Sequence, residues 1–204
     1  MTPATQKRNC SILYNRMQEI EILIKVSSSK IDTLKALANF TTHGVKRILD
    51  IYFVDPLRGD LKPDDTGRLQ ASFRLRQKDS KCLIAYKMDN FDGNEWVYSD
   101  EHETTIGDFE TALHIVQKLG LKELVRIDNE KHTFTTPEYE IVFEDVKGLG
   151  FFLEVEVLEQ IEKKQIVAAK QKIRSFLAKL DLDLGPELNA GKPELMLAKL
   201  KKNS

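Results

Sequence analysis

The sequence predicts an α+β protein in which eight antiparallel strands close into a β-barrel with α-helices packed outside it. Strand-like segments follow one another at hairpin-like spacing, and helical patterns come after the first strand, midway and at the end. Several strands also carry charges at alternate positions and aliphatic residues between them. Successive side chains of a strand point to opposite faces. The aliphatic face is therefore expected under the helices, and the charged face is expected to line a water-filled lumen.

The first strand, predicted over residues 17–26, shows this pattern most clearly. One face is wholly aliphatic, with Ile20, Ile22, Ile24 and Val26. The other face carries Glu19, Glu21, Leu23 and Lys25. An ordinary half-buried strand with its charged face in water alternates in the same way. Further strands of the same kind are what favours a charged lumen over that simpler interpretation.

The remaining elements follow in order. Ser29 is expected to cap a helix with Ile31, Leu34 and Leu37 at helical spacing. Further strands are predicted at Val45–Val54, Leu69–Arg76, Lys81–Lys87, Glu95–Ile106, Lys122–Thr133, Glu138–Asp145 and Phe151–Leu158. Helices are predicted at Asp108–Leu119, over residues 159–180 and at Glu194–Lys202. The polar segments Asp55–Gly67 and Met88–Asn94 are expected to be loops at the mouth of the barrel.

Composition limits the classes of function. The 204 residues include 31 basic and 32 acidic side chains, so no overall field favours nucleic acid or membrane as a partner. No signal peptide or membrane span is seen, and Cys10 and Cys82 are expected to be thiols in the cytoplasm. Residues 1–16 are expected to be a flexible lead-in, 17–182 the barrel domain, and 183–204 a linker with a C-terminal helix.

The charges assigned to the lumen have chemical meaning. The cations are Lys25, Arg74, Arg76, Lys87 and Lys131. The carboxylates are Glu19, Glu21, Glu101, Glu103, Glu144, Glu154 and Glu156. Guanidinium and ammonium groups bind phosphate oxygens, whereas several carboxylates together need a counter-ion such as Mg²⁺. The mixture indicates a metal–polyphosphate site. The alternative for any single pair is a solvated sheet face with weak cross-strand ion pairs.

These motifs resemble the CYTH superfamily, the triphosphate tunnel metalloenzymes. The opening EIEILIK resembles the ExExK signature, SFRLR the paired-arginine strand, AYK the lysine strand and EHET the acidic strand. EDVKGLGFFLEVE is similar to the strand–turn–strand of the branch that contains the class IV adenylate cyclases, and Gly148 and Gly150 suit its turn because glycine adopts positive φ easily.

The resemblance implies an eight-stranded tunnel for a triphosphate such as ATP. It assigns Lys25, Arg74, Arg76, Lys87 and Lys131 to the substrate, with Lys25, Arg76 and Lys87 catalytic. It assigns Mg²⁺ or Mn²⁺ to Glu19, Glu21, Glu144, Glu154 and Glu156, with Glu101 and Glu103 as further tunnel acids. The implied reaction is that of a class IV adenylate cyclase, which converts ATP to cyclic AMP and pyrophosphate.

Three positions depart from the family pattern, because Leu23, Asp100 and Asn129 stand where basic residues are usual. The alternatives are therefore a triphosphatase acting on inorganic triphosphate, thiamine triphosphate or a nucleoside triphosphate, and a triphosphate-binding protein without catalysis. The terminal helix also lacks the serine–tyrosine pair expected of a cyclase-like member. A homodimer is compatible with a barrel flanked by helices, although no motif specifies one.

Overall fold

A computed structural model describes residues 17–202, in which ten strands form one antiparallel sheet. The strands are β1 (Met17–Glu19), β2 (Glu21–Val26), β3 (Thr41–Val54), β4 (Ala71–Lys78), β5 (Lys81–Asp92), β6 (Glu95–Ile106), β7 (Lys122–Thr135), β8 (Tyr139–Val146), β9 (Gly150–Val157) and β10 (Leu184–Leu188). The helices are α1 (Lys30–Leu37), α2 (Phe109–Lys118), α3 (Ile166–Leu177) and α4 (Lys192–Lys202), with a 3₁₀ turn at Lys163–Gln165. The predicted lead-in over residues 1–16 lies outside the described part of the chain.

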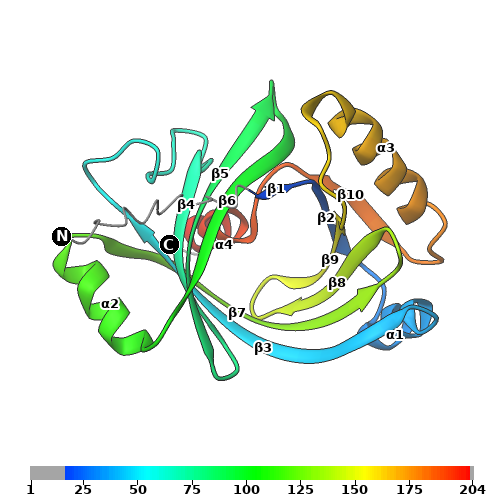
Figure 1. Cartoon of the computed structure of the whole chain (residues 1–204), viewed down its shortest axis with the longest axis horizontal. Helices are drawn as coiled ribbons and strands as arrows, with labels where there is room; N and C mark the ends of the chain where they lie inside the picture. The colour runs from blue at the N-terminus through cyan, green and yellow to red at the C-terminus, as the bar shows by residue number, and fades with distance from the viewer. Residues whose placement is uncertain (1–16, 203–204) are drawn as a thin grey trace, which may run out of the picture.

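The sheet is strongly curled (Figure 1). Its strand order is β1-β6-β5-β4-β3-β7-β8-β9-β2-β10. Only Ile20 separates β1, at one end of this order, from β2, next to the other end. The eight-strand prediction undercounts for two reasons. Its first strand is divided at Ile20, and the segment predicted as a linker contributes β10, which pairs with β2.

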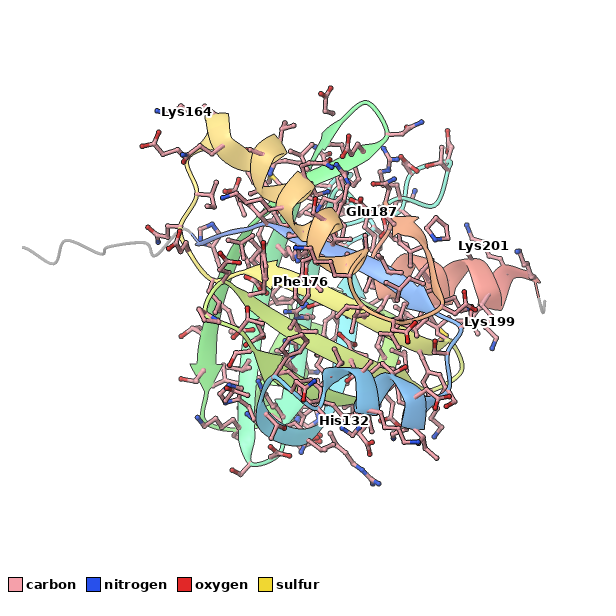
Figure 2. All side chains as sticks on the ribbon, turned by 90° about the vertical axis from the view of Figure 1, so that its right-hand side faces the viewer. His132, Lys164, Phe176, Glu187, Lys199 and Lys201 are labelled. Atoms are coloured by element: carbon pink, nitrogen blue, oxygen red, sulfur yellow. The ribbon has the colours of Figure 1, made fainter. Side chains whose placement is uncertain are left out.

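The aliphatic face of the first strand is buried as predicted. Ile20, Ile22 and Ile24 are at most 6% exposed, and they pack with Ile173 and Leu177 of α3 in one core cluster. Figure 2 shows α3 lying across the outer face of the sheet, with Phe176 on this helix. Burying each such side chain contributes on the order of 1.5–3 kcal/mol. This face therefore anchors the sheet to its outer layer.

Helices α1 and α2 begin at capping residues that the sequence supplies. The Ser29 hydroxyl accepts a hydrogen bond from the Asp32 backbone N–H, which confirms the predicted cap of α1. Asp108 caps α2 by accepting from the Thr111 N–H at 2.7 Å. Helix α2 packs Phe109 against β3 and β4 from outside the sheet (Figure 1).

Helix α4 has a different place from the other helices. Figure 1 shows it within the outline of the curled sheet, and Figure 2 places its residues Lys199 and Lys201 beyond one end of the strands. Its residues Leu195, Met196 and Leu197 pack on a buried cluster that includes Trp96 and Phe152. Helix α4 therefore covers one end of the space that the sheet surrounds.

Two boundaries differ from the sequence prediction. The long helix predicted over residues 159–180 is shorter, because buried positions recur at helical spacing only from Ile166 onwards. The loop predicted at Met88–Asn94 is mostly strand, since β5 and β6 pair as far as Asp92–Glu95 and turn at Gly93 with φ +59°. The positive φ predicted for the GLG turn is confirmed, at +81° for the first glycine and +101° for the second.

Candidate functional site

A cavity of about 420 Å³ lies inside the curled sheet and is lined by side chains from β1 to β9 and from α4. Ten of the predicted site residues line it, namely Glu19, Glu21, Arg74, Arg76, Lys87, Glu101, Glu103, Lys131, Glu154 and Glu156. They come from seven strands far apart in the sequence. Alternate positions meet here because the side-chain period of a strand is two residues and the sheet curls toward this face.

Two predicted residues do not line the cavity. Lys25 is exposed, although it shares the parity of Glu21. Lys25 pairs with Phe152 of β9, at the opposite end of β2 from Glu21, which pairs with the cavity residue Glu156. Its prediction as a lumen cation is therefore corrected.

Glu144 is fully buried behind the cavity wall, at 0% exposure, and was predicted as a metal ligand. Its carboxylate accepts from Lys131 at 2.9 Å, from Lys192 at 2.5 Å and from Asn129 Nδ2 at 2.8 Å. With three donors bound, Glu144 holds those side chains behind the cavity wall. These contacts favour a positioning role, and metal ligation by Glu144 stays a prediction.

A row of carboxylates crosses three neighbouring strands. Glu156 on β9 pairs in register with Glu21 on β2 and with Glu140 on β8. Like charges directly opposite each other destabilise a sheet. Within residues 17–202, Glu156 forms neither an ion pair nor a side-chain hydrogen bond. Burial, followed by repulsion from Glu19, Glu21 and Glu154, raises the pKa of Glu156 to about 9. Such a row is suited to binding a cation.

Lys87 partly compensates this row from the opposite wall. Its ammonium lies 2.7 Å from Glu21 and 2.8 Å from Glu19, and 5.1 Å above the centroid of the Trp96 ring. Burial nevertheless outweighs the attraction of Lys87 and raises the pKa of Glu21 to about 7. One lysine therefore does not neutralise the two carboxylates that it contacts.

Two arginines from β4 are held by carboxylates. Arg76 forms a bidentate pair with Asp50, with nitrogen–oxygen distances of 2.7 and 2.9 Å. Burial favours the neutral acid, but the guanidinium of Arg76 prevails and the pKa of Asp50 lies below its usual value. Arg74 donates to Glu101 at 2.7 Å, while its Nε is buried without a partner in the described chain. Guanidinium groups held in this way are oriented before any ligand arrives.

Lys192, at the start of α4, is a cavity cation that the sequence reasoning missed. It bridges Glu144 at 2.5 Å and Glu154 at 2.6 Å. Burial raises the pKa of Glu154, but Lys192 and Lys131 outweigh this effect and hold it well below the usual value. Strand parity could not identify this lysine, because it belongs to a helix that was predicted to lie beyond the barrel domain.

The three departures from the family pattern have different consequences. Leu23 and Asn129 do line the cavity, whereas Asp100 does not. The side chain of Asp100 has the opposite parity to Glu101, and Asn90 Nδ2 lies 3.4 Å from it. The absence of a basic residue at position 100 therefore removes no cation from the cavity. Asn129 has a buried Oδ1 without a hydrogen-bond partner among the described residues.

Several of the cavity side chains are possible metal ligands. Across residues 17–202, no three acidic, histidine or cysteine side chains already stand together as a ready-made metal site. The carboxylates of Glu19, Glu21, Glu154 and Glu156 nevertheless share one cavity with raised pKa values at Glu21 and Glu156. Oxygen donors that repel one another fit a hard divalent cation. The chemistry of this set therefore suits a hard divalent cation.

The two ends of the cavity differ in exposure. At the end under α4, Glu194 is 8% exposed and Leu69 is 3% exposed, and the Glu194 carboxylate accepts from the Leu69 N–H at 2.8 Å. At the other end, Glu103 has a side chain that is 36% exposed. We call this second end, which also carries Lys78 and Glu140, the open mouth.

Comparison with known proteins agrees with this geometry. A family model described as CYTH domain matches residues 17–184. The Methanocaldococcus jannaschii protein named "Putative adenylate cyclase MJ0240" is 31% identical over 142 residues, which cover 69% of this chain and 77% of that protein. Within residues 17–202, no helix has the length and apolar character needed to cross a membrane.

Solved structures share the fold. The PH1819 protein of Pyrococcus horikoshii OT3 has a TM-score of 0.73 at 24% identity, over 88% of this chain and 99% of that one. The adenylyl cyclase-like protein HpAC1 of Hippeastrum, described as having a dominant triphosphatase activity, has a TM-score of 0.60 at 18% identity, over 90% and 96% of the two chains. Because the family model spans most of the sequence, the chain belongs to the CYTH domain family.

Proposed function

We propose that this chain is a metal-dependent enzyme that acts on a triphosphorylated substrate, and that its reaction is the conversion of ATP to cyclic AMP and pyrophosphate. The observation that carries the proposal is one cavity that combines cations for a phosphate chain with a row of opposed carboxylates for a divalent cation. CYTH proteins are generally enzymes that depend on a metal, and the name of the M. jannaschii relative supports the choice of reaction.

We infer that β1 and β2 act as one strand that closes the sheet into a tunnel. Only Ile20 separates them, and its carbonyl accepts a hydrogen bond from the Val157 N–H at 3.1 Å. Closure would leave the cavity walls without a sheet edge inside the molecule.

The charge of the cavity makes a metal necessary for binding. Among residues 17–202, ten carboxylates and six cations line the cavity. A triphosphate carries several negative charges, so this surplus of acid would repel it unless a divalent cation bound as well. Glu19, Glu21, Glu154 and Glu156 would hold Mg²⁺ or Mn²⁺. When bound, the ion would supply charge neutralisation at the phosphate oxygens.

The cationic side chains would bind and orient the phosphate chain. Arg74 and Arg76 present guanidinium forks, which match phosphate oxygens bidentately, and Lys87 and Lys131 act as point charges. In cyclisation the ribose 3′ hydroxyl loses its proton to solvent and its oxygen bonds to the α-phosphorus. The bond from that phosphorus to the oxygen that bridges to the β-phosphorus breaks, and pyrophosphate leaves with that oxygen. Arg76 and Lys87 would stabilise the charge that develops on the pyrophosphate. Lys25 has no part in this proposal because it is exposed.

Hydrolysis of a triphosphate is the second candidate. Helix α4, KPELMLAKLKK, has no serine or tyrosine to assist a cyclase-like reaction. The Hippeastrum structure, which shares the fold, is described as having a dominant triphosphatase activity. Binding without catalysis is the third candidate, motivated by the uncharged Leu23 and Asn129 in the cavity wall.

Product analysis separates the three candidates. The purified chain would be incubated with ATP and Mg²⁺ or Mn²⁺, and the products would be resolved by chromatography. Cyclic AMP with pyrophosphate supports the cyclase, whereas ADP with phosphate, or release of phosphate from inorganic triphosphate, supports the hydrolase. Calorimetric binding of a triphosphate without any product selects the binding protein. Absence of metal-dependent triphosphate binding would overturn all three.

A further inference from the structure

The open mouth contains a cation without a counter-ion. Lys78, the last residue of β4, lines the cavity two positions beyond Arg76 and four beyond Arg74. In the part of the chain that is described, no carboxylate forms an ion pair with Lys78 or accepts a hydrogen bond from it. Lys46, on the adjacent strand β3, likewise has neither kind of partner within residues 17–202.

Every other cavity cation is paired. The pairs are Arg74 with Glu101, Arg76 with Asp50, Lys87 with Glu19 and Glu21, Lys131 with Glu144, and Lys192 with Glu144 and Glu154. The contrast is notable because the cavity wall holds more acids than bases. A cavity lysine without a carboxylate partner is available to bind an anionic group of a ligand.

The surroundings of Lys78 are themselves cationic. Burial, followed by repulsion from Lys46, Arg76 and Lys131, lowers the pKa of Lys78, and the attraction of Glu103 is a smaller opposing effect. Lys46 and Lys131 are directly opposite each other in the pairing of β3 with β7. Adjacent like charges are unfavourable in a sheet, and a bound polyanion would reverse this penalty.

We propose that Lys78, with Lys46 beside it, forms a subsite at the open mouth for an anionic group beyond a bound triphosphate. The ligand class is a linear inorganic polyphosphate with a fourth phosphoryl group. Alternate residues of a strand are about 6.6 Å apart along it, so Arg74, Arg76 and Lys78 form a row of about 13 Å leading from the interior to the mouth. This proposal rests on the proposed function, since it extends the same phosphate-binding row.

The test measures affinity against chain length. Isothermal titration calorimetry would compare pyrophosphate, triphosphate and tetraphosphate at a fixed concentration of free Mg²⁺, for the native chain and for Lys78→Gln. Losing one charge-assisted contact at a partly exposed site should weaken tetraphosphate binding about tenfold and triphosphate binding much less. Lys78→Arg should keep the native preference, because it keeps the charge.

Lys118→Gln is the matched control. Lys118 is exposed in the last turn of α2 and does not line the cavity, so its loss should change no affinity. An equal effect of Lys78→Gln on all three ligands, or no effect on tetraphosphate, would overturn the subsite. If triphosphate binds but no turnover occurs, only the proposed catalysis fails. If the native chain binds none of the three ligands, the subsite and the triphosphate site both fail.

Discussion

Replacing Glu156 by glutamine should stabilise the metal-free protein, and the gain should depend on pH. Burial and three neighbouring carboxylates raise the pKa of this group from 4.5 to about 9. Below pH 4.5 the acid is protonated in both the folded and the unfolded chain, so it causes no difference in stability. As the pH rises above 4.5, the unfolded chain releases the proton first, and folding becomes progressively less favourable until the pH reaches about 9.

The magnitude follows from the shift. Each pH unit between the two pKa values corresponds to about 1.4 kcal/mol, so near pH 7 the native carboxyl group costs on the order of 3 kcal/mol of folding free energy. Glutamine has a similar shape and does not ionise. The free energy of unfolding of Glu156→Gln should therefore exceed that of the native protein by up to about 3 kcal/mol near pH 7, and the difference should vanish near pH 4.5.

Urea unfolding between pH 4.5 and 8 in the presence of a chelator measures this difference. Glu159→Gln makes the same chemical change at an exposed position just beyond β9, and it should leave stability unchanged at every pH. Added Mg²⁺ should raise the melting temperature of the native protein more than that of Glu156→Gln, because a ligand stabilises the state that binds it. A Glu156→Gln protein that is less stable than the native one near pH 8, or a difference independent of pH, would refute the proposed repulsion among these carboxylates.

Three further predictions concern other parts of the structure. Glu154→Gln should abolish metal-dependent turnover without unfolding the chain. Product analysis measures the turnover, and circular dichroism measures the folding. Unchanged metal dependence would remove Glu154 from the site. Arg76→Ala should weaken triphosphate binding about tenfold or more and monophosphate binding less. It should also lower the free energy of unfolding by about 3 kcal/mol, because buried Asp50 loses its partner. An equal loss of affinity for both ligands in calorimetry would contradict the role of Arg76 in binding the phosphate chain. Ile173→Ala should lower the unfolding free energy by about 2–5 kcal/mol in urea titrations, because Ile173 is 0% exposed on the face of α3 that packs against the sheet. A smaller loss would indicate that the core collapses around the site.

The part of the cavity that comes from strands could be predicted from the sequence. Each of these side chains has the parity of the inward face of its strand, and parity can be counted directly along the sequence. The residues that line one cavity for this reason include Glu21, Arg76, Lys87 and Glu156. Lys78 has the same parity as Arg76, so it was equally visible, but β4 was predicted to end two residues too early. The roles of these residues stay predictions.

Two of the errors in the predicted site, at Lys25 and Lys192, come from contacts between distant parts of the chain. Lys25 has the correct parity, but the cavity does not reach its end of β2, and the extent of the cavity depends on strands that come from distant parts of the chain. Lys192 reaches the cavity only because α4 docks on the cluster around Trp96, and neither helical periodicity nor capping specifies where a short helix docks. Asp100 was misassigned because the alignment of a motif ignored its opposite parity to Glu101.

The cavity is held together by contacts that a bound phosphate chain would have to exchange. A phosphate chain that binds Arg76 competes with Asp50, and one that binds Lys87 competes with Glu21 and Glu19. Each released carboxylate then needs a new cation, or it remains buried and unpaired at a cost of several kcal/mol. A divalent ion arriving with the phosphates meets this need for Glu19 and Glu21 on the acidic wall, whereas Asp50 stays close to Arg74 and Lys131. Metal and phosphate should therefore bind with positive coupling, each raising the affinity for the other by the same factor.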